Sequence, residues 1–220
     1  QAEHYFYNLF DMMVKWDYDY YKIDGQPIVV EEYAKNSQYM YVKGGAADSL
    51  YRTTLDIIRN AIGPNRYLLG CWGLPIEGAG IMNGSRTGGD VVLGWEGFKS
   101  ALNPTMESYF QHNILWYTDP DVMLLRQPFT TDQAQVWATL QGLTGQALMS
   151  SDRLPDLSAE RVKMLHRVFP ATDIRPLDLF PSHTNKKVWD LKINHLNRQY
   201  DVTGLFNFDE GRAEEVALKW

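Results

Sequence analysis

The chain has 220 residues, a formal net charge of −6, and 45% hydrophobic and 13% aromatic residues. This length allows one large domain, or one domain and part of a second, with a substantial core. Its Lys and Arg residues are scattered and give no basic surface for a phosphate backbone, so we expect no nucleic-acid partner. No apolar run is long enough to span a bilayer, and the N-terminal residues lack the layout of a signal peptide.

Cysteine and histidine usage argues against disulfides and metal sites. Cys71 is the only cysteine, which excludes an internal disulfide and a thiolate cluster. The five histidines follow no metal-ligand spacing. We therefore expect no metal, and we assign no histidine to catalysis, including His112 near the start of a predicted strand.

Helices and strands alternate along the first half of the chain. Apolar residues at three- and four-residue spacing indicate amphipathic helices, whereas short aromatic and β-branched runs that end at glycine or proline are typical of buried strands. The run from Tyr18 to Ile23, which meets Gly25 and Pro27, shows the strand pattern. In chain order these patterns predict a helix over residues 1–15, a strand over 18–23, a helix over 48–62, a strand over 67–72 and a short strand flanking the glycine-rich turn 84–90.

The alternation continues to about residue 170 and then changes. Asn103 as N-cap and Pro104 at the first helical position predict a helix that begins there. Beyond Pro170, apolar and polar residues alternate over 189–193 and a second run covers 200–208, which predicts an antiparallel hairpin. The other predicted elements are a helix over 104–111, a strand over 114–118, a helix over 130–143, a strand over 146–150 and a helix from Ser158 to about Val168.

This order predicts an α/β fold with a parallel sheet and crossover helices. The strand and helix units recur at intervals of roughly forty residues, the rhythm of a (β/α)8 barrel, and only about five units precede the change of pattern. A complete barrel needs about 250 residues. We therefore expect the C-terminal portion of a TIM barrel over residues 1–172 and the start of an antiparallel β-sandwich domain over residues 173–220.

Acidic side chains follow several of the predicted strands. Active sites of barrels lie at the carboxyl ends of the strands, where loops begin. Acidic residues are also common at such turns because they cap helices, which is the alternative for any single one. The residues at these strand ends are Asp24, Asp90, Asp119, Asp121 and Asp152.

Lys22 and Asp24 lie two residues apart on the first strand, so their side chains share one face of the sheet. A neighbouring lysine favours the ionised carboxylate, and an ionised carboxylate can attack a carbon centre. Asp24 is therefore the candidate nucleophile. An aldolase-like alternative would use Lys22 as a Schiff-base amine, but the adjacent carboxylate keeps that amine charged and less nucleophilic.

Four motifs in this order carry a family resemblance, namely YKIDGQ at 21–26, GCWG at 70–73, SRTGGD at 85–90 and WYTDPDVML at 116–124. Through them the chain resembles glycoside hydrolases of the clan that includes families 27, 31 and 36, closest to family 36 α-galactosidases and raffinose-synthase-like proteins. HTNKKVWDLKI and DVTGLFNF resemble the first strands of the family's C-terminal β domain. The match runs over most of the chain.

The resemblance implies a retaining α-glycosidase, most closely an α-galactosidase, that forms a covalent glycosyl-aspartate. In this reading Asp24 is the nucleophile, and Asp90 is the general acid that later acts as general base. Lys22 keeps Asp24 ionised and donates to a sugar hydroxyl. Because a direct pair with Arg86 favours the ionised form of Asp90, we expect Arg86 to point at a substrate hydroxyl instead.

Three more residues are implied as substrate contacts. Cys71 and Trp72 would line the sugar pocket, with Trp72 as the stacking face, and Asp121 would lie at the pocket wall. A buried structural cysteine is the alternative for Cys71. The implied partner is an oligosaccharide or glycoside, no cofactor is needed, and family relatives often act outside the cytoplasm.

Two other functions are compatible with these motifs. In a raffinose-synthase-like transferase a sugar hydroxyl replaces water as the acceptor, and the KIDGQ segment is similar to that group. A sugar-binding barrel that has lost turnover is an alternative of another class. Transfer products in the presence of excess sucrose would indicate the first, and saturable sugar binding without release of reducing sugar would indicate the second.

Overall fold

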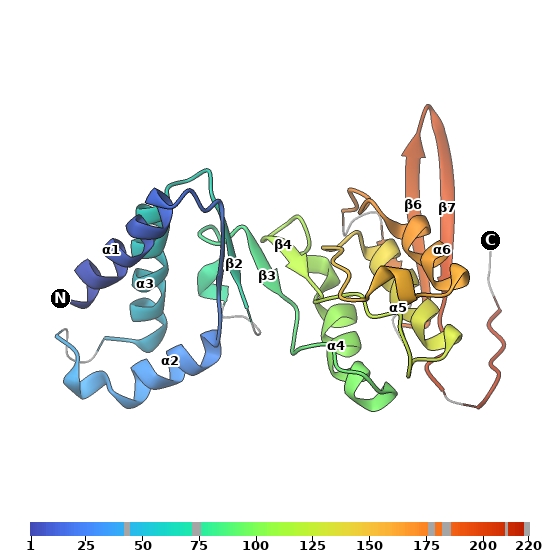
Figure 1. The fold of residues 1–220 in the computed structure, drawn as a ribbon, viewed down its shortest axis with the longest axis horizontal. Helices are drawn as coiled ribbons and strands as arrows, with labels where there is room; N and C mark the ends of the chain where they lie inside the picture. The colour runs from blue at the N-terminus through green and yellow to red at the C-terminus, as the bar shows by residue number, and fades with distance from the viewer. Residues whose placement is uncertain (42–44, 72–75, 176–178, 182–185, 210, 218–220) are drawn as a thin grey trace.

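The computed structural model describes residues 1–41, 45–71, 76–175, 179–181, 186–209 and 211–217. Two groups of helices lie at opposite ends of a parallel sheet (Figure 1). The first group is α1 (Ala2–Lys15), α2 (Gln26–Lys35) and α3 (Ala47–Ile62), and the second is α4 (Trp95–Ser108), α5 (Thr131–Thr144) and α6 (Ala159–Val168). Single-turn 3-10 helices occur at Ser37–Tyr39, Ile76–Gly78, Tyr109–Gln111 and Leu154–Asp156.

The sheet contains four strands in the order in which they occur along the chain. Every neighbouring pair runs parallel, so all four carboxyl ends lie at one edge. This is the arrangement of successive strand–helix–strand units. The predicted parallel α/β fold is confirmed, whereas closure into a barrel stays a prediction. The strands are β1 (Tyr20–Ile23), β2 (Tyr67–Gly70), β3 (Gly84–Arg86) and β4 (Tyr117–Asp119).

One face of the sheet packs against the N-terminal helices. Tyr21 and Leu68 are buried on this face together with Phe10 of α1 and Ile62 of α3. Full burial of one such side chain contributes about 1.5–3 kcal/mol, so these contacts anchor β1 and β2. Side chains alternate between the two faces along each strand, so the residues next to Tyr21 and Leu68 and their register partners lie on the opposite face. The residues of this second face are Tyr20, Lys22, Tyr67, Leu69, Gly84, Arg86, Tyr117 and Asp119.

Tyrosine side chains fill the middle of this second face. Tyr20 and Tyr67 are register partners whose rings stack with centroids 5.3 Å apart. A Cβ on Gly84 would lie 2.1 Å from the Tyr67 hydroxyl, so the absence of a side chain there makes room for the ring. Burial raises the pKa of Tyr67 to about 12, which keeps its phenol neutral.

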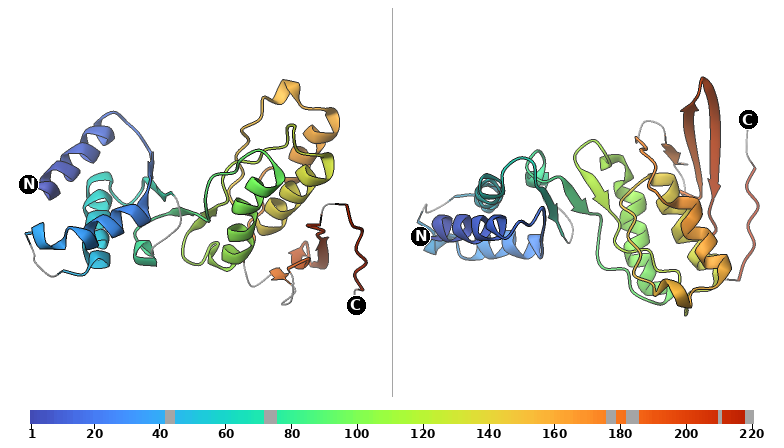
Figure 2. Two further views of the ribbon diagram at one scale, coloured as in Figure 1. Left: turned by 90° about the horizontal axis from the view of Figure 1, so that it is seen from below. Right: turned by 45° about the horizontal axis from the view of Figure 1, so that its top comes forward.

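The largest core lies between α4, α5, α6 and the C-terminal strands. Phe98 of α4 meets Trp137 of α5 edge-on with ring centroids 5.0 Å apart, and Trp189 is fully buried in the same cluster. The strands β5 (Leu179–Pro181), β6 (Val188–His195) and β7 (Arg198–Leu205) form a separate antiparallel sheet beside these helices (Figure 2). The predicted hairpin is confirmed, and the domain boundary at residue 172 stays a prediction.

Helix α4 differs from the sequence prediction. It begins at Trp95 rather than at Pro104, which lies inside the helix. Trp95, Phe98 and Leu102 recur at three- and four-residue spacing and are all buried. Their burial offsets the one backbone hydrogen bond that a proline nitrogen cannot donate.

Smaller corrections concern two strands and one loop. Residues 146–150, all of them described, make a single parallel bridge from Ser150 to Met123 instead of the predicted strand. The strand predicted over 114–118 begins later, as β4 at Tyr117. The preceding residues form a turn instead, in which Ile114 N donates to Gln111 O and Asn113 N donates to Trp116 O. Where a loop was expected after Gly25, α2 begins directly, since this glycine adopts φ 67° and ends the strand abruptly.

Candidate active site

Functional side chains from all four parallel strands meet at the carboxyl edge of the sheet. Asp24 follows β1, Cys71 follows β2, and Arg86 and Asp119 are the last residues of β3 and β4. Backbone hydrogen bonds continue past the strands, from Cys71 N to Ile23 O at 2.7 Å and from Thr87 N to Asp119 O at 2.9 Å. The strand ends are therefore held at a fixed spacing beneath these side chains.

Asp24 is exposed and ionised. Its Oδ1 accepts a hydrogen bond from Gly25 N at 2.7 Å. This bond and a second one from the Cys71 thiol lower the pKa of Asp24, and the positive charges of Lys22 and Arg86 add to the effect. The charge of Lys22 favours ionised Asp24 as expected, although the two hydrogen bonds contribute more than the lysine.

Cys71 connects Asp24 to Arg86. The cysteine is 3% exposed, and its Sγ lies 3.4 Å from Arg86 Nη1. Burial raises the pKa of Cys71, and the hydrogen bond to Asp24 raises it further. The protonated thiol therefore donates to the Asp24 carboxylate, so the cysteine is both buried and part of the polar cluster.

Arg86 lies at the centre of this cluster. Its side chain is 2% exposed, and Nη2 lies 2.8 Å from Asp90 Oδ1 and 2.8 Å from Asp121 Oδ2. Burial by itself lowers the pKa of Arg86, but the charges of Asp121 and Asp119 outweigh it and the net pKa is raised. The expectation that Arg86 points away from Asp90 is wrong, because the turn through Gly88 and Gly89 brings the two side chains together.

Asp90 and Asp121 share Arg86 but differ in exposure. The Asp90 side chain is 81% exposed, whereas that of Asp121 is 15% exposed. Asp121 Oδ2 also accepts a hydrogen bond from Val91 N at 2.7 Å. Asp90 is thus open to a ligand from solvent, and Asp121 is largely enclosed by protein groups.

Asp119 shapes the turn that carries Asp121. Its Oδ1 accepts a hydrogen bond from Asp121 N at 2.8 Å, and Asp121 adopts φ 73°. Burial raises the pKa of Asp119, although the Asp121 N–H and the Arg86 charge act against this. The structure therefore gives Asp119 a place beneath the site rather than at its surface.

Asp152 lies outside the cluster of Arg86. Its carboxylate is fully enclosed and accepts hydrogen bonds from Leu125 N at 2.6 Å and from Arg126 Nη1 at 3.0 Å. These contacts join the segment after β4 to the segment after residue 150. Asp152 follows the isolated bridge at Ser150 rather than the predicted strand, and its contacts are structural.

The remaining predicted residues are accounted for as follows. Trp72 lies outside the described residues. His112 follows the 3-10 turn Tyr109–Gln111 and is buried beside β4, where its Nδ1 lies 2.9 Å from Thr118 Oγ1. Burial lowers the pKa of His112 to about 4, so the ring is neutral at physiological pH. Its contacts are those of a structural residue.

Tyr20 and Tyr67 are residues at this site that the sequence analysis did not select. Tyr20 lies two residues before Lys22 on the same strand face, with Tyr67 stacked on it. Burial raises the pKa of Tyr20, and the nearby Asp119 raises it further. The two-residue period that paired Lys22 with Asp24 could have identified Tyr20 as well.

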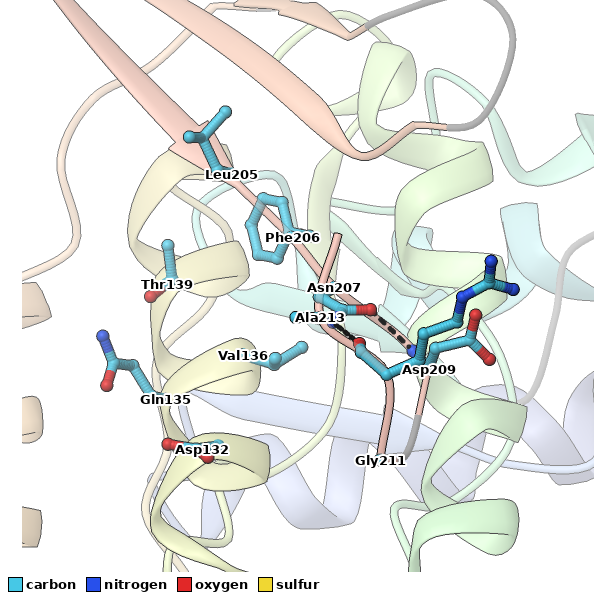
Figure 3. Close-up of a pocket in the computed structure, with 11 residues that line it drawn as sticks. Asp132, Gln135, Val136, Thr139, Leu205, Phe206, Asn207, Asp209, Gly211 and Ala213 are labelled. Atoms are coloured by element: carbon cyan, nitrogen blue, oxygen red, sulfur yellow. Dashed lines mark hydrogen bonds between the residues drawn. The ribbon is translucent and has the colours of Figure 1, made fainter. Parts of the chain in front are cut away.

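A separate hollow of about 460 Å³ lies between α5 and residues 205–213 (Figure 3). Within it, the Asn207 side chain donates to Arg212 O at 2.6 Å and accepts from Asp209 N at 3.0 Å. None of the predicted site residues lines it. We therefore place the chemistry at the strand ends, where charged groups of opposite sign converge.

Within the described part of the chain, no group of three or more His, Cys, Asp and Glu side chains is arranged to hold a metal ion. No helix in the same ranges combines the length and apolarity needed to cross a membrane.

No protein-family model matches the chain. Several solved structures have a similar fold. An α-galactosidase from Thermus thermophilus, in complex with stachyose, is 21% identical with a TM-score of 0.55 over 76% of this chain and 37% of its own. A GH27 β-L-arabinopyranosidase from Geobacillus stearothermophilus is 18% identical with a TM-score of 0.62 over 92% of this chain and 48% of its own. α-Galactosidase I from Mortierella vinacea is 13% identical with a TM-score of 0.60 over 88% and 54%.

The chain spans about half or less of the length of these enzymes. At such identities the likeness is one of fold. The chain thus shares the α/β fold of part of three glycosidases, and its cluster of charged residues lies at the carboxyl edge of the parallel sheet within that fold.

Proposed function

We propose that the chain is part of a retaining α-glycosidase, an α-galactosidase in which Asp24 is the nucleophile and Asp90 the general acid and base. The observation that carries the proposal is one continuous set of contacts. Asp24 interacts electrostatically with Cys71 and with Arg86, the Cys71 Sγ contacts Arg86 Nη1, and Arg86 pairs with Asp90. Two carboxylates from separate strands therefore belong to a single polar cluster, as a reaction with two acidic groups requires.

The two carboxylates have suitably different surroundings. Asp24, whose lowered pKa keeps it ionised, attacks the anomeric carbon while the glycosidic C–O bond breaks. Asp90 transfers its proton to the leaving oxygen. In the second step Asp90 removes a proton from water, which attacks the anomeric carbon and releases Asp24. Retaining enzymes hold the two carboxyl groups about 5–5.5 Å apart for this sequence.

The pair between Arg86 and Asp90 bears on the charge of the acid. A neighbouring guanidinium favours ionised Asp90, whereas the first step needs its proton. A sugar hydroxyl that accepts a hydrogen bond from Arg86 Nη2 would replace Asp90 as the partner of this nitrogen. Asp90 would then be free to hold a proton, and Arg86 would keep Asp121 as its counter-ion.

The proposed sugar rests on the resemblance of the motifs and on the two α-galactosidases among the similar folds. Lys22 and Tyr20 lie on the same strand face as Asp24 and offer a charged donor and an aromatic ring to a hexose. In this proposal residues 1–172 belong to a (β/α)8 barrel and residues 173–220 begin a β-sandwich domain. Remaining barrel strands would come from outside the described ranges.

The test is hydrolysis of nitrophenyl α-D-galactoside by the full-length protein, with the β-L-arabinopyranoside as the second substrate because of the arabinopyranosidase among the similar folds. Asp24→Asn should abolish turnover. Azide should rescue Asp90→Ala and yield the α-glycosyl azide, since a small anion needs no general base. A fully active Asp24→Asn protein would refute the assignment, and products formed with excess sucrose would separate hydrolysis from transfer.

A further inference from the structure

We propose that Asp121 is a positioning residue for the general acid, not a substrate contact: it neutralises Arg86 and fixes the backbone beside Asp90. This inference rests on the proposed function and adds a residue that acts through Arg86 and Asp90. It departs from the sequence-based expectation, which placed Asp121 at the wall of the sugar pocket.

Two contacts hold Oδ2 of the Asp121 carboxylate. Oδ2 forms an ion pair with Arg86 Nη2 at 2.8 Å and accepts a hydrogen bond from Val91 N at 2.7 Å. Val91 is the residue after Asp90, so the second contact holds the backbone that carries the acid. The Asp121 N–H is held in turn by Asp119 Oδ1 at 2.8 Å. Because the side chain is only 15% exposed, little of it is accessible to a sugar.

Charge balance explains why a carboxylate is needed at this position. Arg86 is 2% exposed, and a buried guanidinium requires a nearby anion. Asp121 supplies that anion permanently, so the exposed Asp90 is free to gain or lose its proton. Without Asp121, Asp90 would be the one carboxylate left in direct contact with Arg86 Nη2, and its ionised form would be favoured.

The other groups around the pair do not replace Asp121. Asp119 on β4 and the Cys71 thiol after β2 interact with Arg86 but lie beneath the site. From β1, Asp24 interacts with the same guanidinium, and Lys22 adds a second positive charge near Asp24. Among these carboxylates, Asp121 and Asp90 are the two in direct contact with Arg86 Nη2.

The chain contains a matched control for this arrangement. Asp152 also binds one arginine, through Arg126 Nη1 at 3.0 Å, and it accepts from two backbone N–H groups, Leu125 N at 2.6 Å and Arg126 N at 3.3 Å. Its side chain is fully enclosed, and no residue of the proposed mechanism contacts it. Asp152→Asn therefore removes the same charge from a similar structure and controls for a general loss of stability.

The first experiment needs no substrate. The Asp90 carboxyl carbon is followed by NMR from acid to neutral pH in the full-length protein, with Asp90→Asn to identify its signal. In Asp121→Asn, whose amide oxygen can still accept from Val91 N, loss of the neighbouring negative charge should favour ionised Asp90, so its carboxyl signal should change at lower pH than in the wild type. In Asp152→Asn the midpoint of this change should not move. An unchanged midpoint in Asp121→Asn, or equal shifts in both variants, overturns the inference.

The second experiment uses the reaction. A disaccharide leaving group needs protonation, whereas dinitrophenolate leaves without it. Asp121→Asn should slow cleavage of the disaccharide roughly tenfold and that of the dinitrophenyl glycoside much less, and should move the alkaline limb of the disaccharide profile to lower pH. Equal losses on both substrates indicate a structural role and overturn the inference. If the wild type cleaves no glycoside while the NMR shift is found, the proposed function fails and the charge-balancing role stands.

Discussion

Two arginine–aspartate clusters follow neighbouring parts of the parallel sheet, and they differ in what they leave open. Around Arg126, Asp152 is fully enclosed and its oxygens accept hydrogen bonds from the arginine and from two backbone N–H groups. Around Arg86, Asp121 is held in a similar way, but a second carboxylate, Asp90, is 81% exposed. The first cluster joins loops, whereas the second has the same framework and keeps one acid accessible.

An aspartate at this edge of the sheet is therefore a candidate for chemistry only when backbone donors do not enclose its carboxylate. Asp24 illustrates the intermediate case. It accepts the Gly25 N–H and the Cys71 thiol, yet its side chain remains exposed. Its bonds therefore set its charge without closing it off from a ligand.

The largest expected difference between the exposed and the enclosed carboxylates is in turnover after the charge is removed. Asp24→Asn should lower turnover of nitrophenyl α-galactoside by at least about a thousandfold, because an amide cannot form the covalent intermediate. Asp152→Asn should leave the turnover of folded protein within about twofold. Circular dichroism gives the folded fraction. Similar losses in both variants would contradict the distinction between the clusters.

The buried His112, which belongs to neither cluster, should make the stability of the protein depend on pH. Its folded pKa of about 4 is below the ordinary value of 6.5, so the unfolded chain binds the proton first as the pH falls. Stability should decrease between about pH 6.5 and pH 4, by on the order of 3 kcal/mol in total. Urea unfolding of wild type and His112→Gln checks this, because the difference isolates the histidine from Asp119, whose raised pKa acts in the opposite direction. An identical pH dependence in the two proteins would exclude His112 as the cause.

Stability also sharpens the contrast between the enclosed and the exposed acid. Asp152→Ala leaves the Leu125 N–H without its partner and removes the ion pair with Arg126, so it should cost about 2 kcal/mol of unfolding free energy. Asp90→Ala removes an 81% exposed side chain and should change it by less than about 0.5 kcal/mol. Denaturant titration of both proteins measures the difference. A larger cost for Asp90→Ala would show that Asp90 holds the fold.

The N-terminal cap of α5 contacts neither cluster, so changing it should alter stability slightly and leave turnover unchanged. Thr130 Oγ1 accepts from Gln133 N at 3.2 Å, and Gln133 Oε1 accepts from Thr130 N at 3.0 Å, which closes a capping box on α5. Thr130→Ala should cost about 1 kcal/mol of stability, and Thr130→Ser much less. Turnover at low temperature should be unchanged in both. A loss of turnover would mean that α5 positions the site.

Local patterns predicted the elements whose ends are determined by nearby residues. The capping threonine and Gly145 mark α5, and Ser158 marks α6, whose first turn it caps through Arg161 N at 3.4 Å. The alternation around Trp189 predicted the hairpin, because Trp189 and Leu191 are buried in the core whereas Val188 and Asp190 are only partly buried. Such signals lie within a few residues of the feature they determine.

Features that depend on distant residues could not be predicted in this way. Pro104 lies inside α4 because Trp95 and Phe98 pack against α5, which a cap-based reading of residues 103–104 cannot detect. The motifs indicated which acids gather at the sheet edge. They did not indicate that Arg86 binds Asp90 directly or that Asp152 is enclosed, since both depend on where loops from other strands place their N–H groups.

Cys71 has a practical consequence as the only cysteine of the chain. Its thiol is 3% exposed, and burial raises its pKa, so alkylating reagents should react slowly with the native protein. One mass adduct per molecule would then report how often Cys71 becomes accessible. Protection from labelling by free galactose would reveal sugar occupancy even in a variant that no longer turns over.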